Sequence, residues 1–468
     1  MKKFFHWLNR LPAFRYLSVQ EFSWVLYDVG NSAYTMLACS LIPIWFKALA
    51  VKEVSEGVAA EGFLTQVTAT GAYSLVLSIV TIIIALLGPV LGALADRKET
   101  KKIFFTTTVA IGVVGCLLNG AAWSWILFLI LYVITKVSYQ ASLTFYDSML
   151  NDVTTEERMD RVSSYGYAWG YIGSCIPFLI ALVAYVISGG MLDILPPLVG
   201  KLIGFGITAA WWLLVTIPLI KNYKQNNYVE TEHTSIGKVF KGILKTFKRI
   251  MLEDRKVLFF LIAFFLYIDG VGTIIDNCIN IGTPMISEDP SLQKYVDVFL
   301  VIFLLATQVV AFAGSLVFAA LSKKFKTVPL ILVCIAGYFA VCLYALRLDK
   351  LYQFAILAFG VGCFQGSIQS LSRSYYSKII PPENSGEYFG IYDIFSKGAS
   401  FLGSFVIWIV LSIVPKGVSV GSFTIRPYNL AVAMLAVFFA LGFVFLIISS
   451  KQKSLRGAQE DAQEGAQE

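Results

Sequence analysis

Ionisable and amide side chains recur at helical spacing inside stretches that are otherwise apolar. In "WVLYDVGNSAYTML" (24–37), Asp28, Asn31 and Thr35 stand at i, i+3 and i+7. Three later stretches carry similar sets: Lys136, Gln140, Asp147 and Asn151; Asp269, Thr273, Asp276 and Asn280; Gln365, Gln369 and Arg373. Residues three or four apart share one face of a helix, so each set predicts a polar stripe.

Charged residues at such positions indicate a pathway rather than a packed core. A charge at bilayer depth is costly and usually faces a water-filled cavity, a partner charge or a substrate. Asp28 could therefore form an ion pair, carry a proton or bind a substrate amine. His6 and His233 lie outside the apolar stretches, so a coupled proton would need a carboxylate, for which Asp28 and Asp269 are the candidates. The mixture of cations and carboxylates suits a zwitterion better than a phosphate.

The composition is that of a polytopic membrane protein. The chain has 468 residues, of which 57% are hydrophobic and 14% charged, and its mean hydropathy is +0.72. Windows of about 20 apolar residues, the length that crosses the hydrocarbon core, recur, and alternating strand patterns do not. The predicted helices are 22–49, 69–95, 102–121, 124–150, 162–188, 198–220, 257–286, 297–321, 328–346, 351–378, 387–413 and 428–449.

The distribution of Lys and Arg predicts the orientation. With a cytoplasmic N-terminus, 26 of the 37 fall in cytoplasmic segments and eight in external loops. Basic residues concentrate on the cytoplasmic side of membrane proteins, so both termini are predicted to be cytoplasmic. The expected location, which the charges do not themselves indicate, is the inner membrane of a prokaryote. This sorting accounts for the net charge of +7, and no nucleic-acid partner is expected.

The chain repeats itself. Residues 145–174 align with 375–404 without a gap, and "YDVG" in the first apolar stretch has an echo in "YIDGVG" (267–272). Weak halves of this kind mark duplicated transporters with a site between the halves. The predicted segments are an interfacial N-terminus (1–21), a six-helix bundle (22–220), a cytoplasmic basic linker (221–256), a second six-helix bundle (257–449) and an acidic tail expected to be disordered (450–468).

Several motifs carry a family resemblance. "GPVLGALADRKETKK" (88–102) resembles the loop between helices 2 and 3 of the major facilitator superfamily. "WVLYDVGNSAYT", "IDGVGTIID" and "GSIQSLSRSYYSKIIPPENSGEYFGIYDIFSKGASFLG" resemble the branch that includes the autophagy-linked vacuolar amino-acid effluxer and its bacterial relatives. The resemblance implies an all-α polytopic membrane protein with twelve transmembrane helices in two pseudo-symmetric six-helix bundles, the major facilitator fold.

The resemblance also implies where the substrate cavity lies. In that superfamily helices 1, 4, 7 and 10 line it, and these are the four helices that carry the stripes. The candidate cavity residues are Asp28, Asn31, Lys136, Gln140, Asp269, Thr273, Asp276, Gln365, Gln369, Arg373 and Lys397. For Arg373 a structural ion pair with Asp393 is an equally weighted alternative.

A gate at the cytoplasmic loop is a further implication of the resemblance. Asp96 would lie near the start of helix 11, where the helix dipole favours a negative charge. Arg97 would reach Asp147 or Asp152, and Gly92 belongs to the same motif. The alternative is a basic loop with no gating role. In the second half Lys323 replaces the loop aspartate, so only the first loop can act in the family manner.

These observations favour a secondary active transporter of a small polar solute, with amino acids or similar zwitterions expected and efflux the expected direction. An uncharged sugar or drug-like solute is the alternative within that class, and a transport-inactive receptor or scaffold lies outside it. No nucleotide-binding motif or catalytic cluster is seen, so an enzyme, a cofactor and a metal site are not expected. The expected partners are the substrate, a coupled proton and the lipid bilayer, with the protein a monomer. The linker segment "KVFKGILKTFKRI" is predicted to be a basic helix on the inner membrane face.

Overall fold

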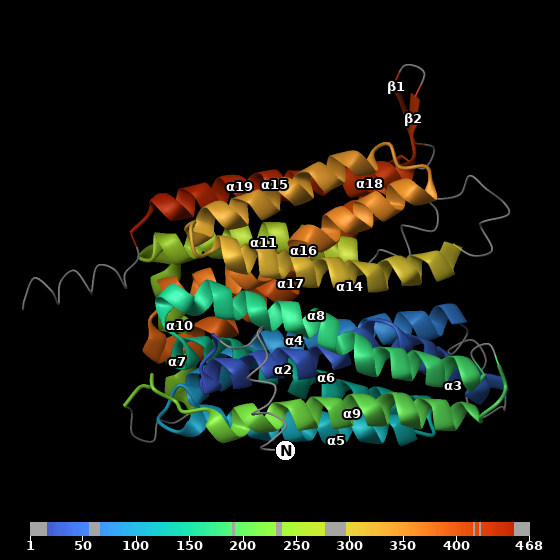
Figure 1. Ribbon diagram of the computed structural model, residues 1–468, viewed down its shortest axis with the longest axis horizontal. Helices are drawn as coiled ribbons and strands as arrows, with labels where there is room; N and C mark the ends of the chain where they lie inside the picture. Colours follow the sequence, from blue (N-terminus) through green and yellow to red (C-terminus); the bar gives the residue numbers. More distant parts are fainter. Residues whose placement is uncertain are drawn as a thin grey trace, which may run out of the picture. The chain divides into compact units, whose positions relative to one another are not determined.

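The computed structural model describes residues 16–55, 66–189, 192–230, 236–276, 296–414, 417–420 and 423–453. Helices dominate it (Figure 1). They are α2 (Val19–Cys39), α3 (Leu41–Ser55), α4 (Gln66–Ala95), α5 (Thr100–Ala121), α6 (Trp125–Ser148), α7 (Leu150–Val153), α8 (Glu156–Ile187), α9 (Pro197–Asn222), α10 (Ile236–Leu252), α11 (Arg255–Asp276), α14 (Val296–Leu321), α15 (Thr327–Ala345), α16 (Leu351–Ile379), α17 (Ser385–Ile413), α18 (Pro427–Met434) and α19 (Ala436–Lys451). A short hairpin pairs β1 (Val418–Val420) with β2 (Phe423–Ile425).

The helices match the expected membrane spans. Ten helical runs in the described part of the chain are long and apolar enough to cross a bilayer, and the bent pair α2–α3 makes an eleventh. The twelfth expected span corresponds to α17, which runs from Ser385 to Ile413. Many large apolar side chains on these runs are exposed to the surroundings, as expected where lipid is the solvent.

The chain divides into two compact units. Unit 1 comprises residues 1–155, 169–239 and 382–390, and unit 2 comprises 156–168, 240–381 and 391–468. The division follows the two halves of the sequence except at two short segments that are exchanged. The first turns of α8 (156–168) pack in unit 2, and the segment 382–390, which includes the first turn of α17, packs in unit 1.

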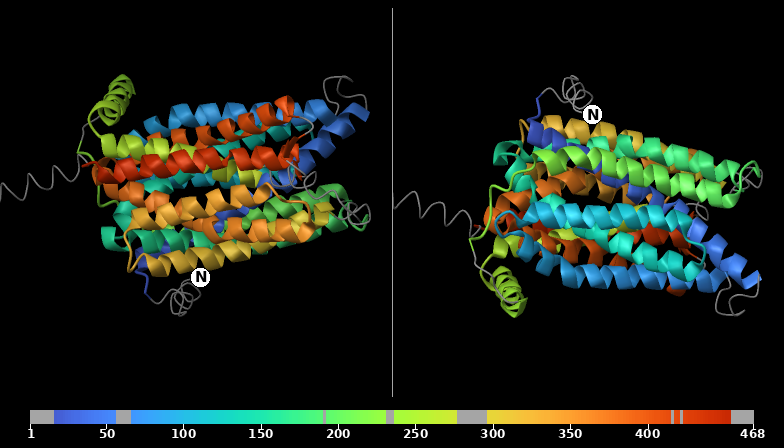
Figure 2. Two further views of the ribbon diagram at one scale, coloured as in Figure 1. Left: turned by 90° about the horizontal axis from the view of Figure 1, so that it is seen from above. Right: turned by 90° about the horizontal axis from the view of Figure 1, so that it is seen from below.

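The two units repeat the same packing order. In unit 1, α2 packs on α9, while α6 packs on α4 and α5, and α5 also contacts α9. In unit 2, α11 packs on α19, while α16 packs on α14 and α15, and α15 contacts α19. Figures 1 and 2 show the long helices of each unit running alongside one another. The duplication inferred from the sequence therefore extends to the helix contacts.

Some helix boundaries differ from those predicted. The first predicted span breaks at Ser40, where Pro43 lies in the first turn of α3 and cannot donate a backbone hydrogen bond. The fifth begins at Glu156 rather than 162, because Thr155 is already extended and precedes two acidic residues that suit a helix N-terminus. The last is divided at Leu435 into α18 and α19. The part of the seventh span after Asp276 lies outside the described residues.

Candidate functional site

The first polar stripe forms a cluster between α2 and α6. Asp28 is buried, and its carboxylate oxygen Oδ1 accepts a hydrogen bond from Asn31 Nδ2 at 3.2 Å. Two turns along α2, the Thr35 hydroxyl is 2.5 Å from the Tyr139 hydroxyl of α6. The stripe on α2 thus contacts α6 at Thr35, while Asp28 and Asn31 are joined to each other.

Lys136 joins this cluster because its ammonium lies over the rings of Tyr34 and Tyr139. Its ammonium lies 5.4 Å from the ring centroid of Tyr139 and 5.9 Å from that of Tyr34. A cation within about 6 Å of a ring face is attracted by the ring quadrupole. The α2–α6 pair therefore presents a carboxylate, an ammonium and two tyrosine rings within unit 1.

An equivalent helix contact in unit 2 fixes the register of the repeat. The hydroxyls of Tyr27 and Ser142 lie 2.6 Å apart between α2 and α6, and those of Tyr267 and Ser372 lie 2.6 Å apart between α11 and α16. In both halves the tyrosine precedes a buried glycine of the same helix by three residues. The second half thus positions α11 on α16 as the first half positions α2 on α6.

Asp269 lies on a different face from Asp28. It is fully buried, and its carboxylate lies beside the backbone of Leu402 and Gly403 in α17. No side chain in the described part of the chain donates a hydrogen bond to either oxygen. A Cβ added to Gly403 would lie 2.1 Å from Thr273 Oγ1. The glycine therefore permits the close approach of α17 to the face of α11 that carries Asp269 and Thr273.

The other predicted cavity residues are less closely placed. Gln365 of α16 is buried, whereas Gln140 and Gln369 are half-buried. Asp276 ends α11 and Lys397 lies within α17, but the side chains of both are outside the described part. Their assignment to a cavity stays a prediction.

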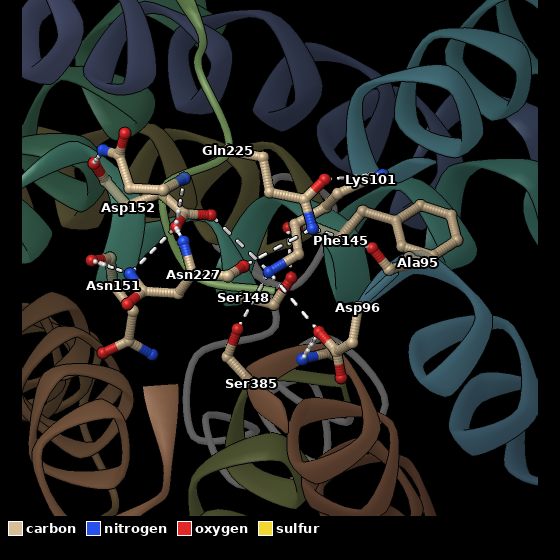
Figure 3. A network of polar contacts seen from close by, with 12 residues as sticks. Ala95, Asp96, Lys101, Phe145, Ser148, Asn151, Asp152, Gln225, Asn227 and Ser385 are labelled. Carbon is tan, nitrogen blue, oxygen red and sulfur yellow. Dashed lines mark hydrogen bonds and ion pairs between the residues drawn. The ribbon is translucent and has the colours of Figure 1, made fainter. Parts of the chain in front are cut away.

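A polar network in unit 1 joins the loop after α4 to the start of α17 (Figure 3). Asp96 accepts hydrogen bonds from the backbone N–H groups of Gly386 at 2.7 Å and Glu387 at 2.9 Å. Lys101 is fully buried, and its ammonium donates to Ser385 Oγ at 2.9 Å and lies 3.5 Å from Asp96 Oδ1. We call Asp96, Lys101, Ser385, Gly386 and Glu387 the first clasp.

Asp96 is the buried titratable carboxyl group at the centre of the first clasp. Burial raises the pKa of Asp96 to about 6, although Lys101 and the two backbone donors oppose that rise. The helix N-terminus adds a partial positive charge that favours the carboxylate. The titration of this contact therefore falls in the mildly acidic range.

Asp152 extends this network to the segment after α9. Its Oδ2 lies 3.6 Å from the Lys101 ammonium and accepts a 2.5 Å hydrogen bond from Tyr223. Its Oδ1 accepts from the backbone N–H groups of Asn226 and Asn227. Burial, together with the negative charge of Asp152, raises the pKa of the Tyr223 phenol well above its ordinary value. One carboxylate thus fastens the start of the linker to α7 and α5.

Close backbone contact accompanies the first clasp. A Cβ added to Gly92 of α4 would lie 2.0 Å from the Gly386 carbonyl oxygen, and one added to Gly390 would lie 2.4 Å from Pro89 Cα. The backbone of Arg97 forms a bridge with Val229, and Asp147 is half-buried at the end of α6. The structure places Lys101 against Asp152, the position for which the sequence suggested Arg97.

Unit 2 holds the exchanged α8 segment with a network of the opposite polarity. Asp160 of α8 accepts hydrogen bonds from Thr327 Oγ1 and Ser374 Oγ, each at 2.6 Å, and Lys378 Nζ lies 2.8 Å from its Oδ2. We call Asp160, Thr327, Ser374 and Lys378 the second clasp. In the first clasp the carboxylate belongs to the receiving unit, whereas here the incoming segment supplies it.

Arg373 strengthens the hold on the same segment. Its Nε donates to Ser163 Oγ at 2.9 Å, an Nη donates to the Ser163 carbonyl at 3.2 Å, and its guanidinium lies 4.5 Å from the centre of the Tyr167 ring. Ser163 Oγ donates in turn to the Ser370 carbonyl. Arg373 is almost fully buried, and these contacts join it to α8.

Lys101 and all four residues of the second clasp were not predicted from the sequence. A signal was present in α16, where Ser367, Ser370, Ser374 and Ser377 recur at i, i+3, i+7 and i+10. Small hydroxyl residues at helical spacing mark a close helix contact in membranes. The partner of that stripe, however, lies more than two hundred residues away in the sequence.

Comparisons with known proteins agree with this architecture. Residues 20–158 and 151–459 match the family described as vacuole effluxer Atg22 like. An uncharacterized MFS-type transporter of Bacillus subtilis (strain 168), YxiO, is 36% identical over 444 residues, which are 94% of this chain and 97% of that protein. Autophagy-related protein 22-1 of Sclerotinia sclerotiorum is 26% identical over 331 residues, which are 64% of this chain and 51% of that protein.

The fold has solved counterparts. The crystal structure of FucP, a major facilitator superfamily transporter in the outward conformation, matches with a TM-score of 0.66 at 14% identity, covering 92% of this chain and 98% of that one. Fold and relatives together define a multi-pass membrane transporter of the major facilitator superfamily with twelve transmembrane helices. Within that class the chain belongs to the vacuole effluxer Atg22-like family. The resemblance and the fold expected from the sequence are both confirmed.

Proposed function

We propose that this transporter moves small zwitterions, amino acids or short peptides, out of the compartment in which its substrate cavity loads, by alternating access. The observation that carries the proposal is the α2–α6 cluster. There the Asp28 carboxylate and the Lys136 ammonium occur in one unit, beside the rings of Tyr34 and Tyr139. A zwitterion needs a partner of each sign, and a buried charge left unpaired is costly. The family's description as an effluxer supports the direction, and the Bacillus relative supports a prokaryotic cytoplasmic membrane.

The two clasps fit a role in the transport cycle. Each holds a segment that one half of the sequence contributes to the other unit: 382–390 in unit 1 and 156–168 in unit 2. Alternating access is a movement of one repeat against the other. We infer that both clasps release when the transporter changes state, with Asp96 and Asp160 as the central acceptors.

Asp269 is the proposed site of a coupled proton. Its carboxylate is fully buried in α11, and no described side chain donates a hydrogen bond to it. An ionised carboxylate in such a place would cost several kcal/mol, and the neutral acid would cost less. Proton binding there would neutralise the carboxylate at the α11–α17 contact, and proton release would restore its charge during the cycle.

The substrate proposal is tested by flux into proteoliposomes with a panel of amino acids, dipeptides and neutral sugars. Asp28→Asn and Lys136→Gln each remove one charged partner, worth about 1.5–3 kcal/mol. We therefore expect the KM for a zwitterion to rise about ten- to hundredfold. The control is Thr81→Ala, because the Thr81 hydroxyl of α4 donates to Leu77 O of its own helix.

The alternative has a distinct outcome. If both charge variants transported a neutral sugar at the normal rate, the substrate would be an uncharged solute and not a zwitterion. If Thr81→Ala lowered flux as much as Asp28→Asn, the loss would be a folding effect and the α2–α6 cluster would lose its support.

A further inference from the structure

Helix α10 is strongly amphipathic. Its seventeen residues include five cations and no acidic residue. At 100° per residue the cations occupy one face and the large apolar side chains the opposite one. The cations are Lys238, Lys241, Lys245, Lys248 and Arg249, and the apolar residues are Ile236, Val239, Phe240, Ile243, Leu244, Phe247, Ile250 and Met251.

The apolar face is largely uncovered by the described part of the chain. The side chains of Phe240, Leu244, Phe247 and Met251 are between 39% and 67% exposed. Among the apolar residues of α10 whose side chains are described, only Ile250, near the C-terminal end, is buried. Figure 2 shows α10 (yellow-green) set at an angle to the helix that follows it rather than packed along it. A contiguous exposed apolar face of this kind usually binds a partner protein or a membrane.

Hydrogen bonds define the junction between α10 and α11. The backbone N–H groups of Glu253 and Asp254 both donate to the Arg249 carbonyl. The buried Asp254 then caps the next helix, because its side chain and carbonyl accept from Val257 and Leu258. That helix, α11, is long and apolar enough from Arg255 onward to cross a membrane. The exposed apolar face of α10 thus ends within a few residues of this apolar span.

The chemistry of the two faces identifies the occupant. The apolar face needs a hydrocarbon partner, and the five cations on the other face need anions. A bilayer interface rich in anionic phospholipid supplies both at once, and basic amphipathic helices bind there. The acidic sequence at 457–468, "GAQEDAQEGAQE", offers charges but no large apolar side chain. It therefore matches only one of the two faces.

We propose that α10 is an anionic-lipid-binding helix that lies in the headgroup region of the membrane. Phe240, Leu244, Phe247 and Met251 enter the acyl boundary, and the five cations contact phosphate headgroups.

The test is amide hydrogen exchange of the full-length protein in nanodiscs of phosphatidylcholine, with and without a phosphatidylglycerol fraction. Lipid binding predicts that amides of 237–252 exchange about tenfold more slowly when phosphatidylglycerol is present. Replacing all five cations by Gln should abolish that difference. Phe240→Gln with Phe247→Gln should speed exchange in both lipids. Exchange requires no transport, so its outcome is independent of the substrate proposal.

The matched control replaces Lys323, Lys324 and Lys326, exposed cations of the loop between α14 and α15, by Gln. This variant should keep the lipid-dependent protection of α10. Equal exchange in the two lipids, or protection that persists without the five cations, would overturn the proposal. Protection in both lipids that is lost on deleting 454–468 would assign the face to the chain's own tail and overturn it as well.

Discussion

At the scale of single residues, the buried carboxylate of Asp160 makes in unit 2 the type of contact that Asp96 makes in unit 1. The second-half loop has Lys323 where the first has Asp96, which predicts that only one loop can hold a partner segment. The structure keeps a carboxylate at the corresponding contact but places it on the arriving helix, as Asp160. Thr327 and Lys378 supply a donor and a cation on the receiving side. The polarity of the contact is reversed while the pairing of opposite charges is retained.

Asp160→Asn should therefore destabilise the protein. The amide cannot accept three donors as a carboxylate does, and Lys378 would lose its counter-ion. We expect the free energy of unfolding to fall by about 1–3 kcal/mol, measured by denaturant titration in mixed micelles. Asp349→Asn is the control, because the Asp349–Arg426 pair is about one-third exposed and such pairs contribute about 0–1 kcal/mol. Equal losses of unfolding free energy in the two variants would show that the second clasp contributes no more than an exposed ion pair.

At the scale of elements, α4 and the first turn of α17 approach backbone to backbone. Gly92 faces Gly386 and Gly88 faces Gly390, and a Cβ on Gly92, Gly386 or Gly390 would overlap the facing backbone or side chain. Small residues at such spacing let membrane helices approach closely. The close approach brings the N–H groups of Gly386 and Glu387 to Asp96, so glycine packing and the charge contact depend on each other.

Gly92→Ala should separate these elements. A methyl group 2.0 Å from the Gly386 oxygen forces a backbone shift, and overpacking of this kind costs about 1–3 kcal/mol. We expect a lower melting temperature and faster amide exchange at 382–390. Gly206→Ala in α9 is the control, since nothing lies within 4 Å of its added Cβ and alanine favours a helix by about 1 kcal/mol. A melting temperature that fell equally in both variants would contradict the packing argument.

At the scale of the whole molecule, the two halves have the same helix packing but differ in the positions of their charged residues. The matching Tyr27–Ser142 and Tyr267–Ser372 contacts align Asp28 with Ile268, and Asp269 with Val29. Val29 lies against Gly173 of α8, as Asp269 lies against Gly403 of α17. The second half therefore has a carboxylate where the first has an apolar helix contact. The two aspartates are not symmetry mates, which allows one to serve the substrate and the other a proton.

This division predicts the effect of Asp269→Asn on coupling. The amide has nearly the size of a protonated carboxyl, so the α11–α17 contact and substrate exchange at equal pH should persist. Accumulation driven by an imposed pH gradient should fall at least about tenfold, because no group at 269 can release a proton. Asp193→Asn, at an exposed loop position, should leave gradient-driven flux unchanged. Full gradient-driven flux in Asp269→Asn would place the proton elsewhere.

The sequence by itself determined the properties that depend on local composition and period. Hydropathy defined the spans, the gap-free alignment of 145–174 with 375–404 revealed the duplication, and helical spacing identified the stripes. Boundaries were less well determined: α8 begins at Glu156 and the first span breaks at Ser40, because capping and proline effects act on single residues within a long apolar run.

Only the tertiary structure decided which polar residues meet. It paired Lys101 with Asp96 and Asp152, directed Arg373 towards Ser163, and set Asp269 against α17. Helical spacing tells which residues of one helix share a face, but not which distant helix covers that face. The exchange of 156–168 and 382–390 between the units arises from contacts across more than two hundred residues. Such contacts depend on how helices pack, so the sequence shows the regular spacing on one helix, as for the serines of α16, but not the helix that covers it.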